Sequence, residues 1–267
     1  MKIIGITSST TEEKHFLNQA YIRSFTTPNT IPLIIPSFEL EENEIISKEF
    51  VNRTKEIVDN FVDKLDMLVL SGGTDVNLTT FGKQNVKVES CNTKRDYIEL
   101  TLAKAFIASG KPVVGICRGF QLLGLELGFS NFIQDLSDTK ELHDSSMSNI
   151  NRRDEPLHNV YLLGDFGSWV KKNGFLTEMA GKLPKMAINS WHKQGFSITK
   201  KAERFNDKEI AGAVYSYGKK HKVEIIMATN KIVEGFRHLT KPIIGFQSHP
   251  EEYKNSIAIQ YILEKYL

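Results

Sequence analysis

Short apolar runs alternate with segments of helical periodicity along the first half of the chain. Each run is four to six residues long, the length of a buried strand, and they lie at 3–6, 31–36, 67–70 and 112–116. Apolar residues recur at helical spacing in the segments between them, at 12–25, 41–64 and 94–109. Strands that alternate with helices predict an α/β fold with a central, mostly parallel sheet.

The second half has a different pattern. Residues 130–160 are polar, and the runs 160–163, 213–217 and 223–229 predict a small antiparallel section. The lysine-rich stretch 218–222 between two of these runs is interpreted as a solvated hairpin tip, with a polyanion site as the weaker alternative. A strand at 242–246 and a helix at 251–266 complete the pattern. No repeat or low-complexity linker divides the chain, so we expect one domain over 1–267.

Charge and cysteine content narrow the classes of function. The chain has 34 basic and 32 acidic residues, a net charge of +2, which does not favour nucleic acid or an anionic membrane as a partner. Its two cysteines do not make a disulfide framework and fit a reducing compartment. The N-terminal apolar run is too short for a signal sequence, and no stretch approaches the ~20 apolar residues of a membrane span. We therefore expect a cytoplasmic protein.

The segment 111–121 carries the strongest chemical signal. An apolar run ends in Gly115-Ile116-Cys117-Arg118-Gly119, and a helical pattern follows at once. This is the cysteine form of a nucleophile elbow, in which a tight strand-to-helix turn presents one side chain. A thiolate there lies at a helix N-terminus, where negative charge is favoured. The alternative is a buried core cysteine, since free cysteine is among the most buried residue types.

A base and its orienting group follow the last apolar run. Residues i and i+2 of extended chain face the same side, and Pro250 biases His249 towards that geometry. Glu251 is therefore predicted to reach the His249 ring and fix its tautomer, as in a catalytic triad. The alternative is a solvated histidine and an acidic residue at a helix start. His192 is a second candidate base, but we prefer His249 because loop histidines of this kind more often contact substrate or stabilise structure.

Two backbone N–H groups are candidates for an oxyanion hole. One belongs to Arg118, and the other comes from the Gly72-Gly73 loop after the run 67–70. Gln121 lies one helical turn beyond Cys117 and faces the same side, in reach of the polar end of a substrate. The alternatives are an ordinary glycine turn and a surface glutamine.

Metal and cofactor signatures are absent from the sequence. No cysteine–histidine cluster has zinc spacing, and no phosphate-binding or dinucleotide glycine fingerprint occurs. No partner can be assigned to His15, His143, His158, His221 or His238. The chemistry expected at Cys117 needs neither a metal nor a cofactor.

In the order and spacing of its motifs the chain resembles class I glutamine amidotransferases. Within them it is similar to the γ-glutamyl hydrolases that cleave γ-glutamyl-γ-aminobutyrate, peptidase family C26. The motifs that carry the resemblance are 71–77, Arg95-Asp96-Tyr97-Ile98-Glu99, 115–123, 133–136, Asn189-Ser190-Trp191-His192-Lys193-Gln194 and 245–251. The resemblance implies a flavodoxin-like three-layer sandwich and a cysteine-dependent hydrolase without a cofactor.

The implied reaction is hydrolysis of a γ-glutamyl amide to glutamate and an amine through a γ-glutamyl thioester. The residues expected to act are the triad Cys117, His249 and Glu251, the oxyanion donors Gly73 and Arg118, and the substrate-binding residues Gly72, Gln121, Asn189, Ser190, Trp191 and His192. The alternative function is a glutaminase subunit that passes ammonia to a separate synthetase partner. A non-catalytic binding protein is disfavoured because all three triad positions are filled, and a homodimer is compatible with either enzyme.

The chain departs from the family pattern at three places, so the resemblance does not identify the amine that is released. Leu78-Thr79-Thr80-Phe81-Gly82 stands where the family often has proline and tyrosine, and Gly128-Phe129 replaces a double glycine. Both changes are expected to reshape the leaving-group side of the pocket. The usual Asp-Gly before the last strands is replaced by the segment 230–236.

Overall fold

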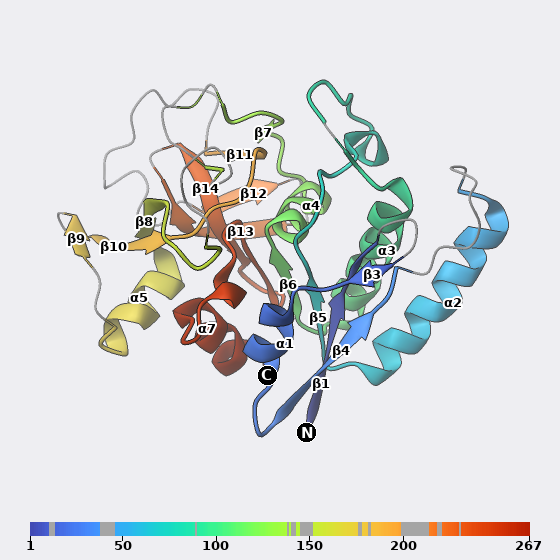
Figure 1. Cartoon of the computed structure of the whole chain (residues 1–267), viewed down its shortest axis with the longest axis horizontal. Helices are drawn as coiled ribbons and strands as arrows, with labels where there is room; N and C mark the ends of the chain where they lie inside the picture. The colour runs from blue at the N-terminus through green and yellow to red at the C-terminus, as the bar shows by residue number, and fades with distance from the viewer. Residues whose placement is uncertain are drawn as a thin grey trace.

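The computed structural model describes most of the chain: residues 1–10, 14–37, 46–88, 90–137, 139, 143–144, 152–175, 178–180, 183–198, 214–217, 221–229 and 231–267. Five neighbouring strands of its sheet run parallel (Figure 1), and the turns after three of them, β5, β6 and β15, hold predicted site residues. In spatial order they are β4 (Thr30–Ile35), β1 (Lys2–Thr7), β5 (Met67–Leu70), β6 (Val113–Ile116) and β15 (Ile243–Phe246). The last three are buried at every position, as expected of strands covered on both faces.

An antiparallel section continues the same sheet beyond β15. Its strands follow in the order β14 (Ile232–His238), β13 (His221–Ala228), β8 (His158–Leu162), β10 (Leu183–Ile188) and β9 (Glu178–Ala180). Further strands pair at its margin: β11 (Gly195–Ser197) with β14 and with β7 (Phe132–Ile133), and β12 (Val214–Tyr217) with β13. Within the described part of the chain, thirteen strands therefore share one sheet.

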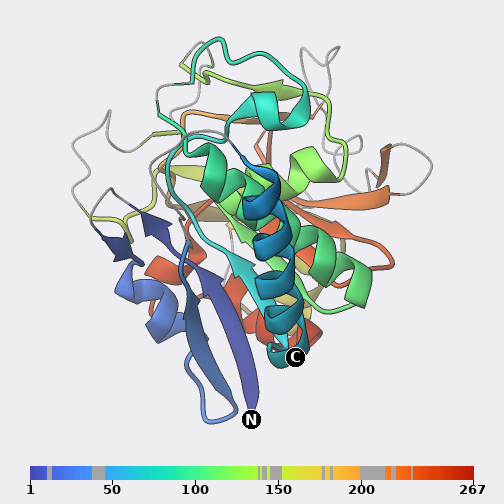
Figure 2. The same ribbon diagram turned by 90° about the vertical axis from the view of Figure 1, so that its right-hand side faces the viewer.

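Helices cover both faces of the parallel strands (Figure 1, Figure 2). Leu68 and Leu70 of β5 pack against α2 (Lys48–Lys64), α3 (Thr93–Ser109) and α4 (Arg118–Glu126). Met67 and Val69, which point to the other face, pack with α1 (Gln19–Phe25), α5 (Gly164–Lys172) and α7 (Ile257–Tyr266). The prediction of a three-layer α/β fold is confirmed.

Two predicted helices are shorter in the structure. The strands β2 (Ser9–Thr10) and β3 (His15–Phe16) pair before α1, so only the last seven of the described residues in the expected helix 12–25 are helical, and residues 12 and 13 lie outside the described ranges. The helix expected over 251–266 begins at Ile257, where the Ser256 hydroxyl caps it by accepting the Ile259 N–H. The residues before it include the short 3-10 turn η3 (Pro250–Glu252). A second short 3-10 turn, η1 (Leu78–Phe81), lies after β5.

Two expectations concern residues outside the described ranges. Residues 41–45 of the expected helix 41–64 lie there, and α2 begins at Lys48 after the Ser47 cap. Residues 218–220 of the lysine-rich hairpin tip lie there as well. Among the helices that the structure describes, none combines the length and apolarity of a membrane span. The single domain over 1–267 stays a prediction.

Candidate active site

Cys117 occupies a strained turn between β6 and α4. Its φ is 52° and its ψ is −105°, and it is the sole non-glycine residue with positive φ in the described ranges. Such a conformation costs on the order of 1–3 kcal/mol and persists where the surrounding packing enforces it. A Cβ at Gly115 would lie 2.6 Å from the Gly119 carbonyl oxygen, and one at Gly119 would collide with the Leu70 carbonyl. Both flanking glycines are therefore required by the close approach of β5, β6 and α4.

Backbone hydrogen bonds fix the turn against the neighbouring strand. The Cys117 N–H donates to the Phe246 carbonyl at 2.8 Å, which ties the end of β6 to the end of β15. The Cys117 carbonyl accepts the Gln121 N–H at 3.1 Å and starts α4. The thiol thus lies at a helix N-terminus, as the sequence predicts, and is 5% exposed. The other cysteine, Cys91, is exposed and free.

His249 and Glu251 form a buried pair just after β15. His249 Nδ1 lies 2.7 Å from Glu251 Oε1, and both side chains are almost completely buried. Burial alone lowers the pKa of His249, but the negative charges of Cys117 and Glu251 outweigh it and raise that pKa to about 10. The arrangement therefore stabilises an imidazolium beside the Cys117 sulfur at neutral pH.

The glycine loop after β5 faces both groups. A Cβ at Gly72 would lie 2.9 Å from His249 Cε1 and 3.6 Å from Cys117 Cβ, so no larger residue fits between them. The Gly72 N–H donates to the Tyr21 hydroxyl at 2.8 Å. Because the Gly72 N–H already has this partner, the Gly73 N–H is the candidate oxyanion donor of this loop. The Arg118 N–H is the second candidate donor. A Cβ at Gly73 would collide with the Arg95 guanidinium.

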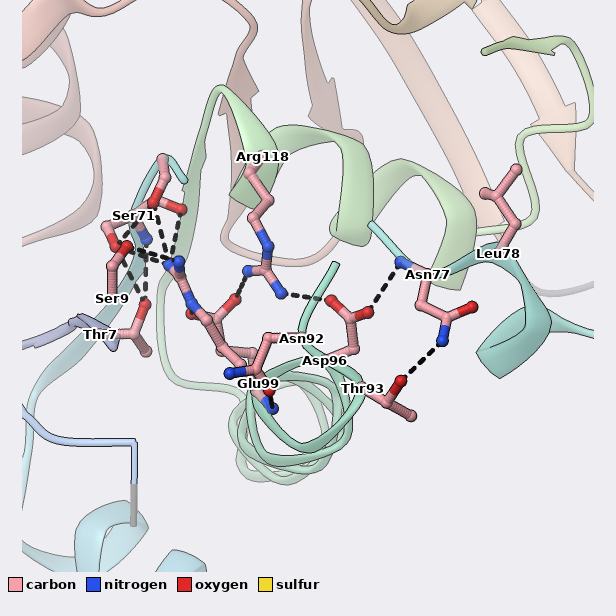
Figure 3. A network of polar contacts seen from close by, with 12 residues as sticks. Thr7, Ser9, Ser71, Asn77, Leu78, Asn92, Thr93, Asp96, Glu99 and Arg118 are labelled. Atoms are coloured by element: carbon pink, nitrogen blue, oxygen red, sulfur yellow. Dashed lines mark hydrogen bonds and ion pairs between the residues drawn. The ribbon is translucent and has the colours of Figure 1, made fainter. Parts of the chain in front are cut away.

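A buried ionic network lies beneath the elbow (Figure 3). The Arg118 side chain points from α4 to the carboxylates of Asp96 and Glu99 on α3. Arg95 Nε lies 2.8 Å from the same Glu99, and Arg95 Nη2 donates to the Gly72 carbonyl at 3.0 Å. The network thereby links the two loops that carry the predicted oxyanion donors. Sequence reasoning assigned no role to these side chains, although the Arg95–Glu99 spacing of i, i+4 marks an ion pair on a helix.

Cys117 and His249 line one cleft of about 470 Å³. Gly72, Gly73 and Trp191 line it too, as the resemblance implies. Its remaining lining residues are Ser9, Phe16, Leu17, Asn18, Tyr21, Ser71 and Arg153. The Arg153 guanidinium lies 5.1 Å from the Trp191 ring centroid and pairs with Glu252 at 2.7 Å. The cleft therefore combines a thiol, an imidazole, a guanidinium and aromatic surface.

Four predicted substrate-binding residues do not line this cleft, and each makes a polar contact within the protein. Asn189 accepts the His249 N–H at 3.0 Å and donates to the His249 carbonyl at 2.9 Å, so it braces the histidine. The Gln121 side chain donates to the Gln194 carbonyl at 3.0 Å. The Ser190 hydroxyl donates to the His143 carbonyl.

His192, the fourth of these residues and the second candidate base, is buried away from the cleft lining. Its Nδ1 lies 2.8 Å from the Gln194 carbonyl oxygen, and its Nε2 lies 3.7 Å from Glu234 Oε1. His192, His143 and Glu234 form a group that is suited to hold a metal ion. The structure therefore does not group His192 with Cys117.

Comparisons with known proteins agree with this geometry. A model of the family Peptidase C26 matches residues 2–251. The glutamine amidotransferase-like protein YvdE of Lactococcus lactis is 28% identical over 206 residues, which cover 75% of this chain and 72% of that protein. Protein NtpR of Enterococcus hirae is 26% identical over 195 residues, 72% of this chain and 69% of its own. The glutaminase domain of Trypanosoma brucei CTPS, solved with bound acivicin, has a TM-score of 0.54 at 13% identity, covering 98% of this chain and 92% of that one, which shows the fold alone.

Proposed function

Because the chain belongs to the peptidase C26 family, we propose that it hydrolyses a γ-glutamyl amide bond with Cys117 as its nucleophile. The family places the chain among hydrolases or amidotransferases, and the resemblance that the motifs indicate is confirmed. The observation that carries the finer proposal is the meeting of Cys117 with the His249–Glu251 pair in one cleft. A strained cysteine beside an oriented, charged imidazole is the arrangement that activates a thiolate.

In the first half of the proposed reaction, the Cys117 thiolate attacks the γ-carbonyl carbon of the substrate. The carbonyl oxygen becomes an oxyanion, and the N–H groups of Gly73 and Arg118 stabilise it. One such donor is typically worth ~3 kcal/mol. When the C–N bond breaks, the His249 imidazolium gives its proton to the departing nitrogen. The products of this half are a free amine and a γ-glutamyl thioester on Cys117.

The second half uses the same histidine as a base. Acylation removes the negative charge of the sulfur, which is one of the causes that raise the pKa of His249. The neutral ring then takes a proton from water, and the hydroxide attacks the thioester carbon. Glutamate leaves, Cys117 returns as a thiolate and His249 as an imidazolium. The charge of Glu251 stabilises the imidazolium at both stages.

The cleft supports a substrate with a carboxylate at one end. Arg153 presents a guanidinium whose paired N–H donors match a carboxylate, and it is proposed to bind the α-carboxylate of the glutamyl group. Trp191 and Phe16 supply apolar surface for the hydrocarbon part of either end. Arg153, Trp191 and Phe16 therefore replace Gln121, Ser190 and His192 as the proposed substrate-binding residues. Asn189 instead positions His249.

The experiment that tests this function measures glutamate release by the purified protein from glutamine and from a panel of γ-glutamyl amines. Efficient turnover of one or more γ-glutamyl amines, without any second protein, is the expected result. Glutamine hydrolysis that appears only with a synthetase partner would instead support the alternative function, a glutaminase subunit. No release from any compound of the panel would contradict the hydrolase proposal.

A further inference from the structure

Three histidines converge on one buried carboxylate outside the cleft. Glu234 lies in the middle of β14 and is completely buried. Its Oε1 is 3.3 Å from His143 Nδ1, 3.5 Å from His158 Nε2 and 3.7 Å from His192 Nε2. The ligand atoms of His143, His192 and Glu234 all lie within 4.8 Å of one another.

Backbone contacts hold two of these histidines side by side. The His192 N–H donates to the His143 carbonyl at 3.1 Å, and Asp144 forms an antiparallel bridge with Trp191. The ring centroids of His143 and His192 are 5.1 Å apart. This arrangement is therefore built by the fold of two segments that lie far apart in the sequence.

The tautomer of His192 indicates that a cation belongs in the cluster. A carbonyl oxygen only accepts hydrogen bonds, so His192 Nδ1, 2.8 Å from the Gln194 oxygen, carries the hydrogen. In the neutral ring, Nε2 then has a lone pair, and it faces Oε1 of Glu234. Two electron pairs that face each other in a buried site repel unless a positive charge lies between them. The hydrogen bond from the far ring nitrogen to a backbone carbonyl is also the usual outer-shell support of a metal-bound histidine.

The distances from the imidazole nitrogens to Glu234 are near those of a metal site. Zinc binds imidazole nitrogen and carboxylate oxygen at about 2.0–2.2 Å, which places tetrahedral ligands roughly 3.3–3.5 Å apart. Oε1 of Glu234 lies 3.3 Å from His143 Nδ1, within that range, and 3.7 Å from His192 Nε2, slightly beyond it. We propose that Glu234, His143 and His192 bind a Zn²⁺ ion.

The ion's role is structural, because its ligands are buried and none of them lines the cleft of Cys117. Its ligands come from the segment 143–144, the loop 189–194 and β14. The same loop carries Asn189, which braces the His249 backbone, and Trp191, which lines the cleft. Zinc would hold this loop in place without touching substrate, so the site is independent of which amide the protein cleaves.

Calorimetric titration of Zn²⁺ into the chelator-treated protein tests the proposal. Cysteine thiolates are zinc ligands, so the titration uses a Cys91→Ser/Cys117→Ser protein, which has no thiol. We expect binding of one equivalent. Co²⁺ should bind with the visible absorption of a tetrahedral site, and Zn²⁺ should raise the unfolding temperature. If this protein does not bind Zn²⁺, the proposal is overturned, whatever the variants below show.

Single substitutions in the same background locate the site. Glu234→Gln and His192→Gln should each weaken Zn²⁺ binding by at least about 100-fold, because even outer-shell partners of a bound metal are worth 10–100-fold. The matched control is His15→Gln, which removes an exposed histidine and should leave the affinity unchanged. Undiminished affinity in folded Glu234→Gln protein would contradict the assignment.

Discussion

The Nδ1 atom of His249 lies 2.7 Å from Oε1 of Glu251, so a buried carboxylate holds the ring and leaves Nε2 outside this contact. The carboxylate fixes the tautomer and stabilises the imidazolium. Because the two residues are separated only by Pro250, their geometry is a local property of the chain. The pairing with Cys117 is not local, since it requires β6 and β15 to lie side by side.

Glu251→Gln is expected to keep the shape of this pair and to lose its charge. The neutral amide stabilises the imidazolium less and does not select its tautomer, so kcat should fall by roughly 10²–10⁴-fold. Steady-state glutamate release measures the effect, and circular dichroism checks the fold. Activity near that of the wild type would show that Glu251 does not act through His249.

The negative charge of Cys117 is expected to contribute to the raised pKa of His249. Burial lowers the pKa of this ring, while Cys117 and Glu251 together raise it to about 10. Cys117→Ala removes one of the two raising charges, so the His249 pKa should fall below that of the wild type. NMR titration of the imidazole resonances measures both values. An unchanged or higher pKa in the variant would mean that no thiolate–imidazolium pair exists.

Arg153→Gln is expected to weaken substrate binding and to leave the chemical step largely intact. A hydrogen bond to a charged group is worth about 1.5–3 kcal/mol, which corresponds to a rise in KM of roughly 10–150-fold. Lys185→Gln is a matched control, because Lys185 contacts the Tyr161 ring and does not line the cleft. Equal KM values for the two variants would contradict the role of Arg153.

Gly119→Ala is expected to destabilise the protein, because its Cβ would collide with the Leu70 carbonyl beside the elbow. Strain of this kind typically costs 1–3 kcal/mol and should lower the midpoint of urea unfolding. Gly195→Ala is the control, since the nearest atom to its Cβ lies 3.4 Å away. A Gly119→Ala protein as stable as the Gly195→Ala protein would show that the turn tolerates a side chain.

Much of the fold follows from local signals in the sequence. The apolar run 67–70 is a strand with those bounds, and the glycines around Cys117 form the predicted turn. Each signal depends on a few neighbouring residues, so it is readable without the tertiary structure. The helix expected over 12–25 was wrong in its first part because β2 and β3 pair there, and pairing is decided between segments.

The parts of the site that sequence reasoning missed depend on long-range contacts. Arg118 reaches carboxylates of α3, and Gln121 turns to the loop carbonyl of Gln194. The ligands proposed for zinc lie at 143, 192 and 234, so no short spacing marks them and the sequence led us to expect no metal. Only the fold brings them to one carboxylate.

Cys117→Ala is the measurement that tests the central claim most directly. The purified variant and the wild type are compared for glutamate release from the best γ-glutamyl amine, and for thermal unfolding in parallel. We expect turnover to fall to the background rate while the unfolding temperature stays within a few degrees of the wild type, because the substitution removes one sulfur atom and retains the backbone. Undiminished hydrolysis by a folded Cys117→Ala protein would contradict the mechanism.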